Sequence, residues 1–578
     1  MSDTTFELIV RGGEVLDGTG AAARRLDVGV RDGLIAAVEP SLDADAAVVL
    51  DATGRVVTPG FVDVHTHYDG QITWDEVLEP STPHGVTTLL TGNCGVGFAP
   101  VRPDGHRELI ELMEGVEDIP GAALWEGMTW GWETYPEYLD LLEGRRWSVD
   151  VGTQLPHGAV RSYVMGERAG DGATPDDVEH MARLVQEGIE VGAFGFTTSR
   201  TLAHRSVTGD TVPGTYAQDD ELFALGRAVA AGGGRVFEAA GSGIAPVDDP
   251  DVTAREIEWM GRLADATGLT ATFILLQCDD APTRWRDELA EAAAWRARGA
   301  RVVPLVAGRS AGVLWTWAVR HPFSARPSYR ALAHLPLPER LEQLRRPEVK
   351  AAILAEDDEY VDFLEARHGE RVGRTLAKCF AMVGHPDYEQ PPDASIGARA
   401  EQRGTTMWEV AYDDLLTDGA VLLLPLYNYT DGDHAVLYEQ FQDPGAVLAL
   451  NDGGAHSMTI CDASIPTYLL THWVRDRTRG PRIELADAVR RLTSQPADLY
   501  GLTDRGRIEV GRRADLNVID TTNLQLGMPV PVADLPAGGT RILQDAQGYD
   551  ATIVAGEITR RCGIDTGARP GRLLRRSS

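Results

Sequence analysis

Eight short apolar runs alternate with helical stretches along the middle of the chain, and this alternation limits the fold more than any other feature. The runs are FVDVHTH at Phe61, VTTLLTG at Val86, VGTQLPHG at Val151, AFGFTTS at Ala193, RVFEAAG at Arg235, ATFILLQ at Ala271, RVVPLVAG at Arg301 and AVLALND at Ala446. Strands that alternate with helices form parallel sheets, and eight is the strand number of a TIM (β/α)8 barrel. We therefore predict an α/β fold built on such a barrel.

The two ends of the chain differ from this middle part. Residues 6–58 contain short alternating strands broken by turns, and a similar pattern returns near the end in RGRIEVGRRADLNVID and YDATIVAGEITRR. Such patterns indicate antiparallel strands. We predict that residues 1–58 and 503–578 together form a small β-sandwich domain, and that residues 59–502 form the barrel domain.

The interval between the seventh and eighth runs is much longer than an ordinary βα connection. It covers residues at about 310–445. TIM barrels tolerate insertions on the face that carries the active site. We expect this insertion to form a lid or cap.

The charge balance argues against several classes of partner. The chain carries 87 acidic and 54 basic residues, which gives a formal net charge of −33. Nucleic acid phosphates and anionic lipid surfaces therefore repel it. No apolar run approaches the ~20 residues that span a bilayer, and the N-terminus lacks the pattern of a secretory signal. We expect a cytoplasmic protein that acts on a small molecule, with no nucleic acid or membrane partner; whether it is a monomer or a homo-oligomer stays open.

The segment GFVDVHTHYDG carries the strongest signal of chemistry. His65 and His67 lie two residues apart at the end of an apolar strand. Residues at i and i+2 of a strand point to the same side, so both imidazoles can face one metal ion. An isolated HxH is common, and the alternative interpretation is two polar residues at a strand end.

Several motifs in a consistent order give this segment its context. They are VLDGTG, TPGFVDVHTH, HGVTTLLTGNCGVGFAP, GAFGFTTSRT, LNDGGAH and PADLYGLTDRGRIEVGRRADLNVID. With these motifs the sequence resembles the amidohydrolase superfamily over nearly its whole length, and within it the D-aminoacylase and N-acyl-D-amino-acid deacylase branch. The resemblance implies a metal-dependent hydrolase that uses metal-activated water to cleave an amide C–N bond of an N-acyl amino acid or a related small molecule. Zn²⁺ is the favoured ion.

The resemblance assigns roles to three further residues. Cys94, in TGNCGVG, stands where the branch has a metal-ligating cysteine, and a thiolate beside two imidazoles suits zinc. Asp452, in LNDGGAH, matches the aspartate that activates the metal-bound water and delivers its proton to the leaving amine. His157, in LPHGAVR, matches a histidine that polarises the scissile carbonyl or binds substrate. The alternatives are a buried apolar cysteine, a turn aspartate and a core histidine.

The sequence departs from the branch at the fourth, fifth and sixth strands. Many binuclear amidohydrolases carry a carboxylated lysine on the fourth strand. The fourth run has none, because the only two lysines of the sequence, Lys350 and Lys378, both fall in the insertion. The fifth and sixth runs place Glu238 or Ala240 and Gln277 where the branch has histidine ligands. A carboxylate and an amide bind zinc more weakly than two histidines.

The ligands that remain predict one metal ion rather than two. The predicted ligands are His65, His67, Cys94 and Asp452, with Glu238 as a further oxygen ligand or an acid/base group. A His2Cys set also suits copper, so an enzyme with non-hydrolytic chemistry on the same scaffold is one alternative. A barrel that binds a small molecule without catalysis is another, and the metal content of the purified protein separates them.

Candidates for substrate binding follow from the expected substrate class. The carboxylate of an N-acyl amino acid needs a cationic partner, and Arg suits bidentate binding. Arg200 and Arg309 both stand just past predicted strand ends. Gln277 has the donor and acceptor groups to position a substrate amide. His456, four residues after Asp452, is expected to face the same pocket as a substrate contact or as the partner of a metal ligand.

Overall fold

The computed structural model describes residues 5–244 and 250–576, and within these residues strands from both ends of the chain form one nine-stranded sheet. Its strands are β1 (Phe6–Val15), β2 (Arg24–Arg31), β3 (Leu34–Glu39), β4 (Ala46–Asp51), β5 (Val56–Pro59), β18 (Leu516–Ile519), β23 (Tyr549–Val554), β24 (Glu557–Arg561) and β25 (Ile564–Asp565). Strand β5 pairs with β1 in parallel and with β18 in antiparallel fashion, so it joins the two ends. A separate domain with the two layers of a sandwich stays a prediction.

Each of the eight predicted barrel runs contains a strand in the described part of the chain. These strands are β6 (Phe61–Asp63), β7 (Val86–Thr91), β8 (Asp150–Thr153) continued by β9 (Leu155–Pro156), β10 (Gly195–Ser199), β11 (Val236–Ala240), β12 (Thr270–Ile274), β13 (Arg301–Val306) and β17 (Val447–Leu448). They pair in parallel in two sheets, β6-β7-β8 and β17-β13-β12-β11-β10-β9. A parallel bridge between Thr66 and Gly453 connects the segments that follow β6 and β17. The predicted strand positions are confirmed, and complete closure into one ring stays a prediction.

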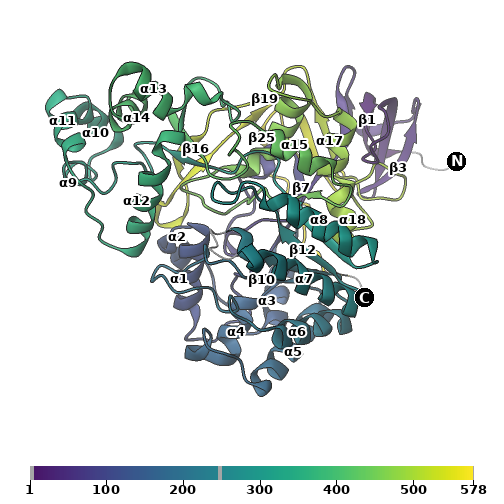
Figure 1. The fold of residues 1–578 in the computed structure, drawn as a ribbon. Coiled ribbons are helices and arrows are strands. Elements are labelled where there is room, and N and C mark those ends of the chain that lie inside the picture. The colour runs from purple at the N-terminus through teal and green to yellow at the C-terminus, as the bar shows by residue number, and fades with distance from the viewer. Residues whose placement is uncertain (1–4, 245–249, 577–578) are drawn as a thin grey trace.

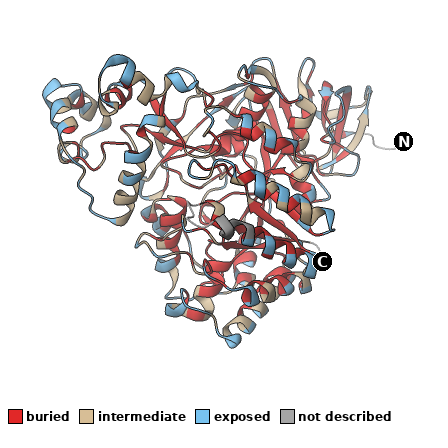
Figure 2. Ribbon diagram, viewed as in Figure 1, coloured by how far each residue is buried: buried red, intermediate tan, exposed pale blue. Residues whose placement is uncertain are grey.

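Helices cover these strands. They are α1 (His106–Glu117), α2 (Gly121–Gly127), α3 (Tyr135–Glu143), α4 (His157–Met165), α5 (Pro175–Glu190), α6 (Asp219–Ala231), α7 (Pro250–Thr267), α8 (Arg284–Ala297), α15 (Ala435–Gln442), α16 (Ile465–Tyr468), α17 (Leu485–Leu492) and α18 (Ser494–Tyr500). Helix α5 begins with a capping box between Thr174 and Asp177, and its buried Met181, Val185 and Ile189 recur at helical spacing. Figure 2 shows the resulting pattern, with buried strands inside and exposed helix faces outside.

The predicted insertion forms a body with its own hydrophobic core. It contains β14 (Gly312–Trp315), β15 (Phe380–Met382), β16 (Val421–Pro425), α9 (Pro327–Arg330), α10 (Leu337–Leu344), α11 (Pro347–Ala355), α12 (Phe363–Thr375), α13 (Ile396–Arg403) and α14 (Met407–Leu415). Trp317, Phe323 and Tyr412 pack against one another in a cluster of buried residues that is distinct from the barrel core. Figure 1 shows α9–α14 at one side of the molecule and β1 and β3 at the opposite side.

Two short hairpins lie between the terminal sheet strands β18 and β23. Strand β19 (Gln525–Leu526) pairs with β22 (Ala546–Gln547), and β20 (Val530–Ala533) pairs with β21 (Thr540–Leu543). None of the helices in the described residues has the length and apolar character that crossing a membrane requires.

Candidate metal centre

His65 and His67 lie just past the end of β6, and their rings face the same pocket. The ring centroids are 5.4 Å apart, and both residues are buried. The Asp452 backbone N–H donates to the His65 carbonyl at 3.1 Å, and the His67 N–H donates to the Gly453 carbonyl at 2.8 Å. The histidine segment is therefore held in place by the loop that follows β17.

Cys94 joins the two histidines in a compact group. Ligand atoms of the three residues all lie within 4.8 Å of one another, and all three residues are buried. The Cys94 Sγ lies 3.4 Å from His65 Nε2, and the same nitrogen lies 3.5 Å from Asp452 Oδ1. Two imidazoles, a thiol and a carboxylate are ligands that zinc prefers. The structure thus brings together four residues that the sequence suggested.

Two buried carboxylates lie against the other ring nitrogens of the histidines. Glu238 Oε1 lies 3.4 Å from His65 Nδ1, and Glu117 Oε1 lies 3.4 Å from His67 Nδ1. Metal-ligating histidines commonly hold their second ring nitrogen against such a carboxylate. Glu238 also accepts from the Cys94 backbone N–H at 3.3 Å. Because Glu238 faces Nδ1 of His65, it is placed to orient that ring; its role as a further ligand or an acid/base group stays a prediction.

The electrostatics of the centre reflect its burial and its acidic groups. Burial alone lowers the pKa of His65, but Glu238 raises this pKa to about 9. Burial raises the pKa of Asp452 to about 6, although His65 acts in the opposite direction. Burial and the neighbouring Glu117 raise the pKa of the Cys94 thiol well above its usual value. A site this acidic favours a cation, which also draws the proton from a coordinating thiol.

The residues present fit a divalent metal ion. Among the described residues, His65 Nδ1, His67 Nδ1 and Glu117 Oε1 are buried without a hydrogen-bond partner. Buried polar groups without a partner are costly, and native proteins leave few of them. A cation bound by the two rings would polarise their N–H groups toward the carboxylates and offset the negative charge.

A second group of potential metal ligands consists of Glu389, His434 and His472. Its carboxylate already has cationic partners within the protein. Arg477 donates to Glu389 Oε1 at 2.9 Å, and His472 Nε2 lies 2.6 Å from Glu389 Oε2. The guanidinium already neutralises the carboxylate, so this group is a buried ion-pair network.

A pocket opens onto the metal centre. Its polar lining comprises His65, His67, Cys94, Glu117, Asp118, His204, Arg320, Arg367, His368, Arg371, Tyr427, Asp452, His456, Thr459 and Asp462. His456 is therefore in this pocket, as predicted, and its Nε2 lies 3.7 Å from Glu117 Oε2. The insertion supplies α12 to the pocket wall, which agrees with a cap over the site.

His157 and Gln277 are not among the residues that line this pocket. The ring nitrogens of His157 lie 2.9 Å from Thr198 Oγ1 and 3.0 Å from Glu221 Oε1, so both are occupied by protein groups. The Gln277 side-chain amide donates to Asp431 Oδ2 at 3.0 Å and thereby holds a loop of the insertion. Both side chains are engaged with protein groups, and their predicted roles toward substrate stay predictions.

Arg200 and Arg309 also lie outside the pocket. Arg200 donates to the Thr215 and Ala217 carbonyls and pairs with Glu256 at 3.2 Å. Arg309 is fully buried and pairs with Asp462 at 2.8 Å. Their positions just past strands were predicted correctly, but their charges are already paired inside the protein.

The cations that do line the pocket come from the insertion, and sequence reasoning missed them. Arg367 and Arg371 lie one turn apart on α12, so they share a face of the helix. Arg320 pairs with Asp118 at 2.9 Å, and Arg367 donates to the Ala203 carbonyl. The Arg371 guanidinium has no hydrogen bond or ion pair with any other described residue. The i, i+4 pair in ARHGER was the available signal.

The chain belongs to the amidohydrolase family, whose sequence pattern it matches over residues 48–560. It is a hydrolase that acts on C–N bonds. N-acyl-D-glutamate deacylase of Alcaligenes xylosoxydans xylosoxydans is 28% identical over 583 residues, which cover 99% of this chain and 97% of that protein. D-aminoacylase of the same organism is 32% identical over 231 residues, which cover 40% of this chain and 43% of that protein. The predicted resemblance is thus confirmed.

Solved structures show the same fold. The N-acyl-D-glutamate deacylase of Bordetella bronchiseptica, complexed with zinc and a phosphonate inhibitor, has a TM-score of 0.65 and 24% identity and covers 99% of this chain and 100% of its own. A D-aminoacylase with a binuclear metal centre has a TM-score of 0.64 and 22% identity, with the same coverage. The family match and the deacylase relative do not favour the non-hydrolytic or non-catalytic alternatives.

Proposed function

We propose that this protein hydrolyses the amide bond of N-acyl amino acids at a single divalent cation, with zinc as the favoured ion. The proposed ligands are His65, His67, Cys94 and Asp452. The observation that carries the proposal is the buried His2Cys group at the floor of a pocket whose wall holds an unpaired arginine. A single ion is favoured because the fifth and sixth strands carry Glu238 and Gln277, which are engaged with protein groups.

A cation at this centre supplies Lewis acidity and lowers the pKa of water. The side chains of the protein orient the ligands and transfer the proton. Glu238 and Glu117 hold the two imidazoles in orientation, and Asp452 Oδ1 faces the same nitrogen of His65 as the thiol does. Asp452, whose carboxylate lies 3.5 Å from His65 Nε2, is proposed to take the proton of the attacking water and pass it to the leaving amine. The C–N bond breaks, the hydroxyl of water joins the acyl carbon, and the amine receives the proton.

The substrate carboxylate is proposed to bind Arg371. This arginine lines the pocket, is half-buried and lacks a protein partner among the described residues. Hydrogen bonds between charged groups contribute about 1.5–3 kcal/mol, which corresponds to about a 10- to 100-fold change in binding. The neighbouring Arg367 adds positive charge on the same helix face.

The proposal is tested by assaying zinc-loaded protein on N-acetyl derivatives of D- and L-amino acids. We expect amine release for at least one series, and loss of activity after chelation. Arg371→Ala should raise KM about 10- to 100-fold with a smaller effect on kcat. Arg374→Ala, which removes an exposed arginine of the same helix, is the matched control and should behave as wild type. Absence of amine release from every substrate by zinc-loaded protein would reject the proposed activity.

A further inference from the structure

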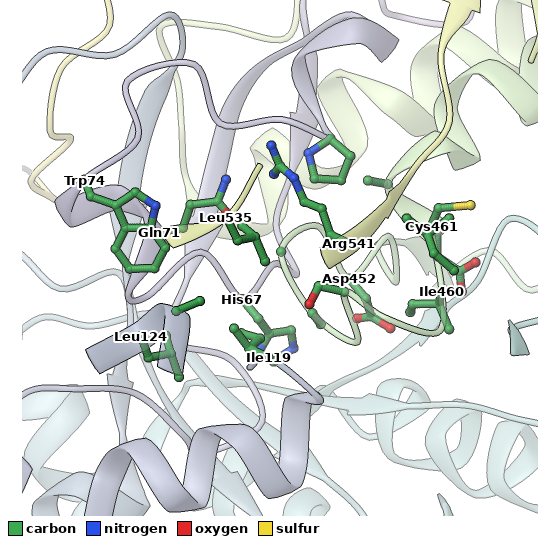
Figure 3. Close-up of a pocket in the computed structure, with 18 residues that line it drawn as sticks. His67, Gln71, Trp74, Ile119, Leu124, Asp452, Ile460, Cys461, Leu535 and Arg541 are labelled. Atoms are coloured by element: carbon green, nitrogen blue, oxygen red, sulfur yellow. The ribbon is translucent and has the colours of Figure 1, made fainter. Parts of the chain in front are cut away.

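A smaller chamber adjoins the main pocket at His67 and Asp452, which line both spaces. It is much smaller than the main pocket. Figure 3 shows His67 and Asp452 beside this chamber, with Ile119 and Leu124 on one side and Leu535 and Arg541 on another. The chamber therefore begins at the metal centre, and the arginines of the insertion are not among its lining residues.

The walls of the chamber are mainly apolar and come from four parts of the chain, one of which is the segment after β17 that contains Asp452 and Ile460. Trp74 follows β6, Leu124 belongs to α2, and Leu535 belongs to the loop between β20 and β21. Arg541 also lines the chamber, but its charge does not make the chamber a site for an anion. Its guanidinium donates at 2.8 Å to both oxygens of Asp534, so it is paired within the protein. The chamber suits a neutral apolar group.

The far walls have little freedom to move outward. A Cβ atom built on Gly70 would lie 2.8 Å from Leu124, and one built on Gly127 would lie 2.8 Å from the Trp74 ring. Both side chains therefore lie directly against glycine backbone. An occupant longer than the chamber would have to displace packed groups, which is costly in a protein interior.

We propose that this chamber receives the acyl group of the substrate and restricts it to short chains such as acetyl. The inference rests on the proposed function. With the scissile carbonyl at the cation and the amino acid carboxylate at Arg371 in the main pocket, the acyl chain must leave the carbonyl in another direction. The chamber bounded by His67 and Asp452 is the space that starts at the same point.

The test is a series of N-formyl, N-acetyl, N-butanoyl and N-hexanoyl derivatives of one amino acid. We expect kcat/KM to fall about tenfold or more from acetyl to hexanoyl in the wild-type enzyme, since small changes in a tight apolar pocket have effects of this order. Leu535→Ala enlarges the chamber and should restore part of the activity on the longer chains. Val532→Ala, on the same hairpin but outside the chamber lining, should keep the wild-type profile.

Equal or greater activity on hexanoyl than on acetyl substrates would overturn the inference while leaving the proposed function intact. The same holds if Leu535→Ala and Val532→Ala give identical profiles. If no amide is hydrolysed, the proposed function is rejected. The role of the chamber is then tested separately by the binding of the carboxylic acids that hydrolysis would release. Calorimetry on zinc-loaded protein should then show tighter binding of acetate than of hexanoate; the reverse order would contradict the chamber's role.

Discussion

At the scale of single residues, the two carboxylates behind the histidines make a specific prediction. Glu238→Gln and Glu117→Gln each remove the negative charge that faces an Nδ1 atom while keeping the side-chain shape. Zinc affinity should fall about 10- to 100-fold, as is usual for partners of metal-ligating histidines. Competition with a zinc chelator measures the effect. Glu179→Gln, at an exposed position on α5, is the matched control. Unchanged zinc affinity in both buried variants would contradict an orienting role.

The residues of the site differ in how far the sequence could predict them. His65 and His67 follow from strand alternation, whereas Cys94 and Asp452 needed the resemblance to a family. Glu117 had no local signal, because it ends helix α1 and reaches His67 only through the fold. Arg200 and Arg309, both near strand ends, are not among the residues that line the pocket, and their charges are paired with Glu256 and Asp462. The pocket cations instead stand on a helix of the insertion.

At the scale of elements, helix α4 is held to α6 through a buried ion-pair network. His157, which begins α4, and Arg161 both contact Glu221 of α6. Burial alone raises the pKa of Glu221, but the bonds from His157 and Arg161 lower it to about 2, below the ordinary value of 4.5. The stabilisation is therefore complete above pH 4.5 and is lost as the pH falls toward 2.

Glu221→Gln should lower stability at neutral pH by about 3–5 kcal/mol, because it leaves Arg161 buried without its partner charge. The variant should also lose part of the acid dependence of stability below pH 4.5. Thermal unfolding between pH 3 and 7 measures both effects, with the exposed Glu187→Gln as control. Zinc content should stay at the wild-type level. A loss of zinc, or an acid profile equal to that of wild type, would argue against a purely structural role for this network.

The elements themselves were largely predictable. All eight apolar runs contain strands, because short β-branched and apolar stretches between helical segments have few alternatives. The exact strand ends were not predictable. Strand β6 ends at Asp63, before His65, and the residues that follow bond both to Leu90 of β7 and to the loop after β17. The fold of the insertion could not be predicted from the sequence either, because its core depends on contacts between residues far apart in the chain.

At the scale of the whole molecule, three parts meet around the pocket. The barrel strands provide the histidines and the thiol, the insertion provides the arginines, and the hairpins before β23 provide one wall of the smaller chamber. The terminal sheet joins both ends of the chain through β5 and β18. The arrangement explains why the residues that line the pocket are spread over the sequence and why motifs located the candidate metal ligands better than the rest of the lining.

The metal content of the purified protein tests the central claim most directly. Elemental analysis should find close to one zinc per chain in the wild-type protein. His65→Ala and His67→Ala should lose the zinc and the activity together while unfolding cooperatively like the wild type. Wild-type protein that binds no metal when zinc is supplied, or variants that keep a full zinc complement, would contradict the account.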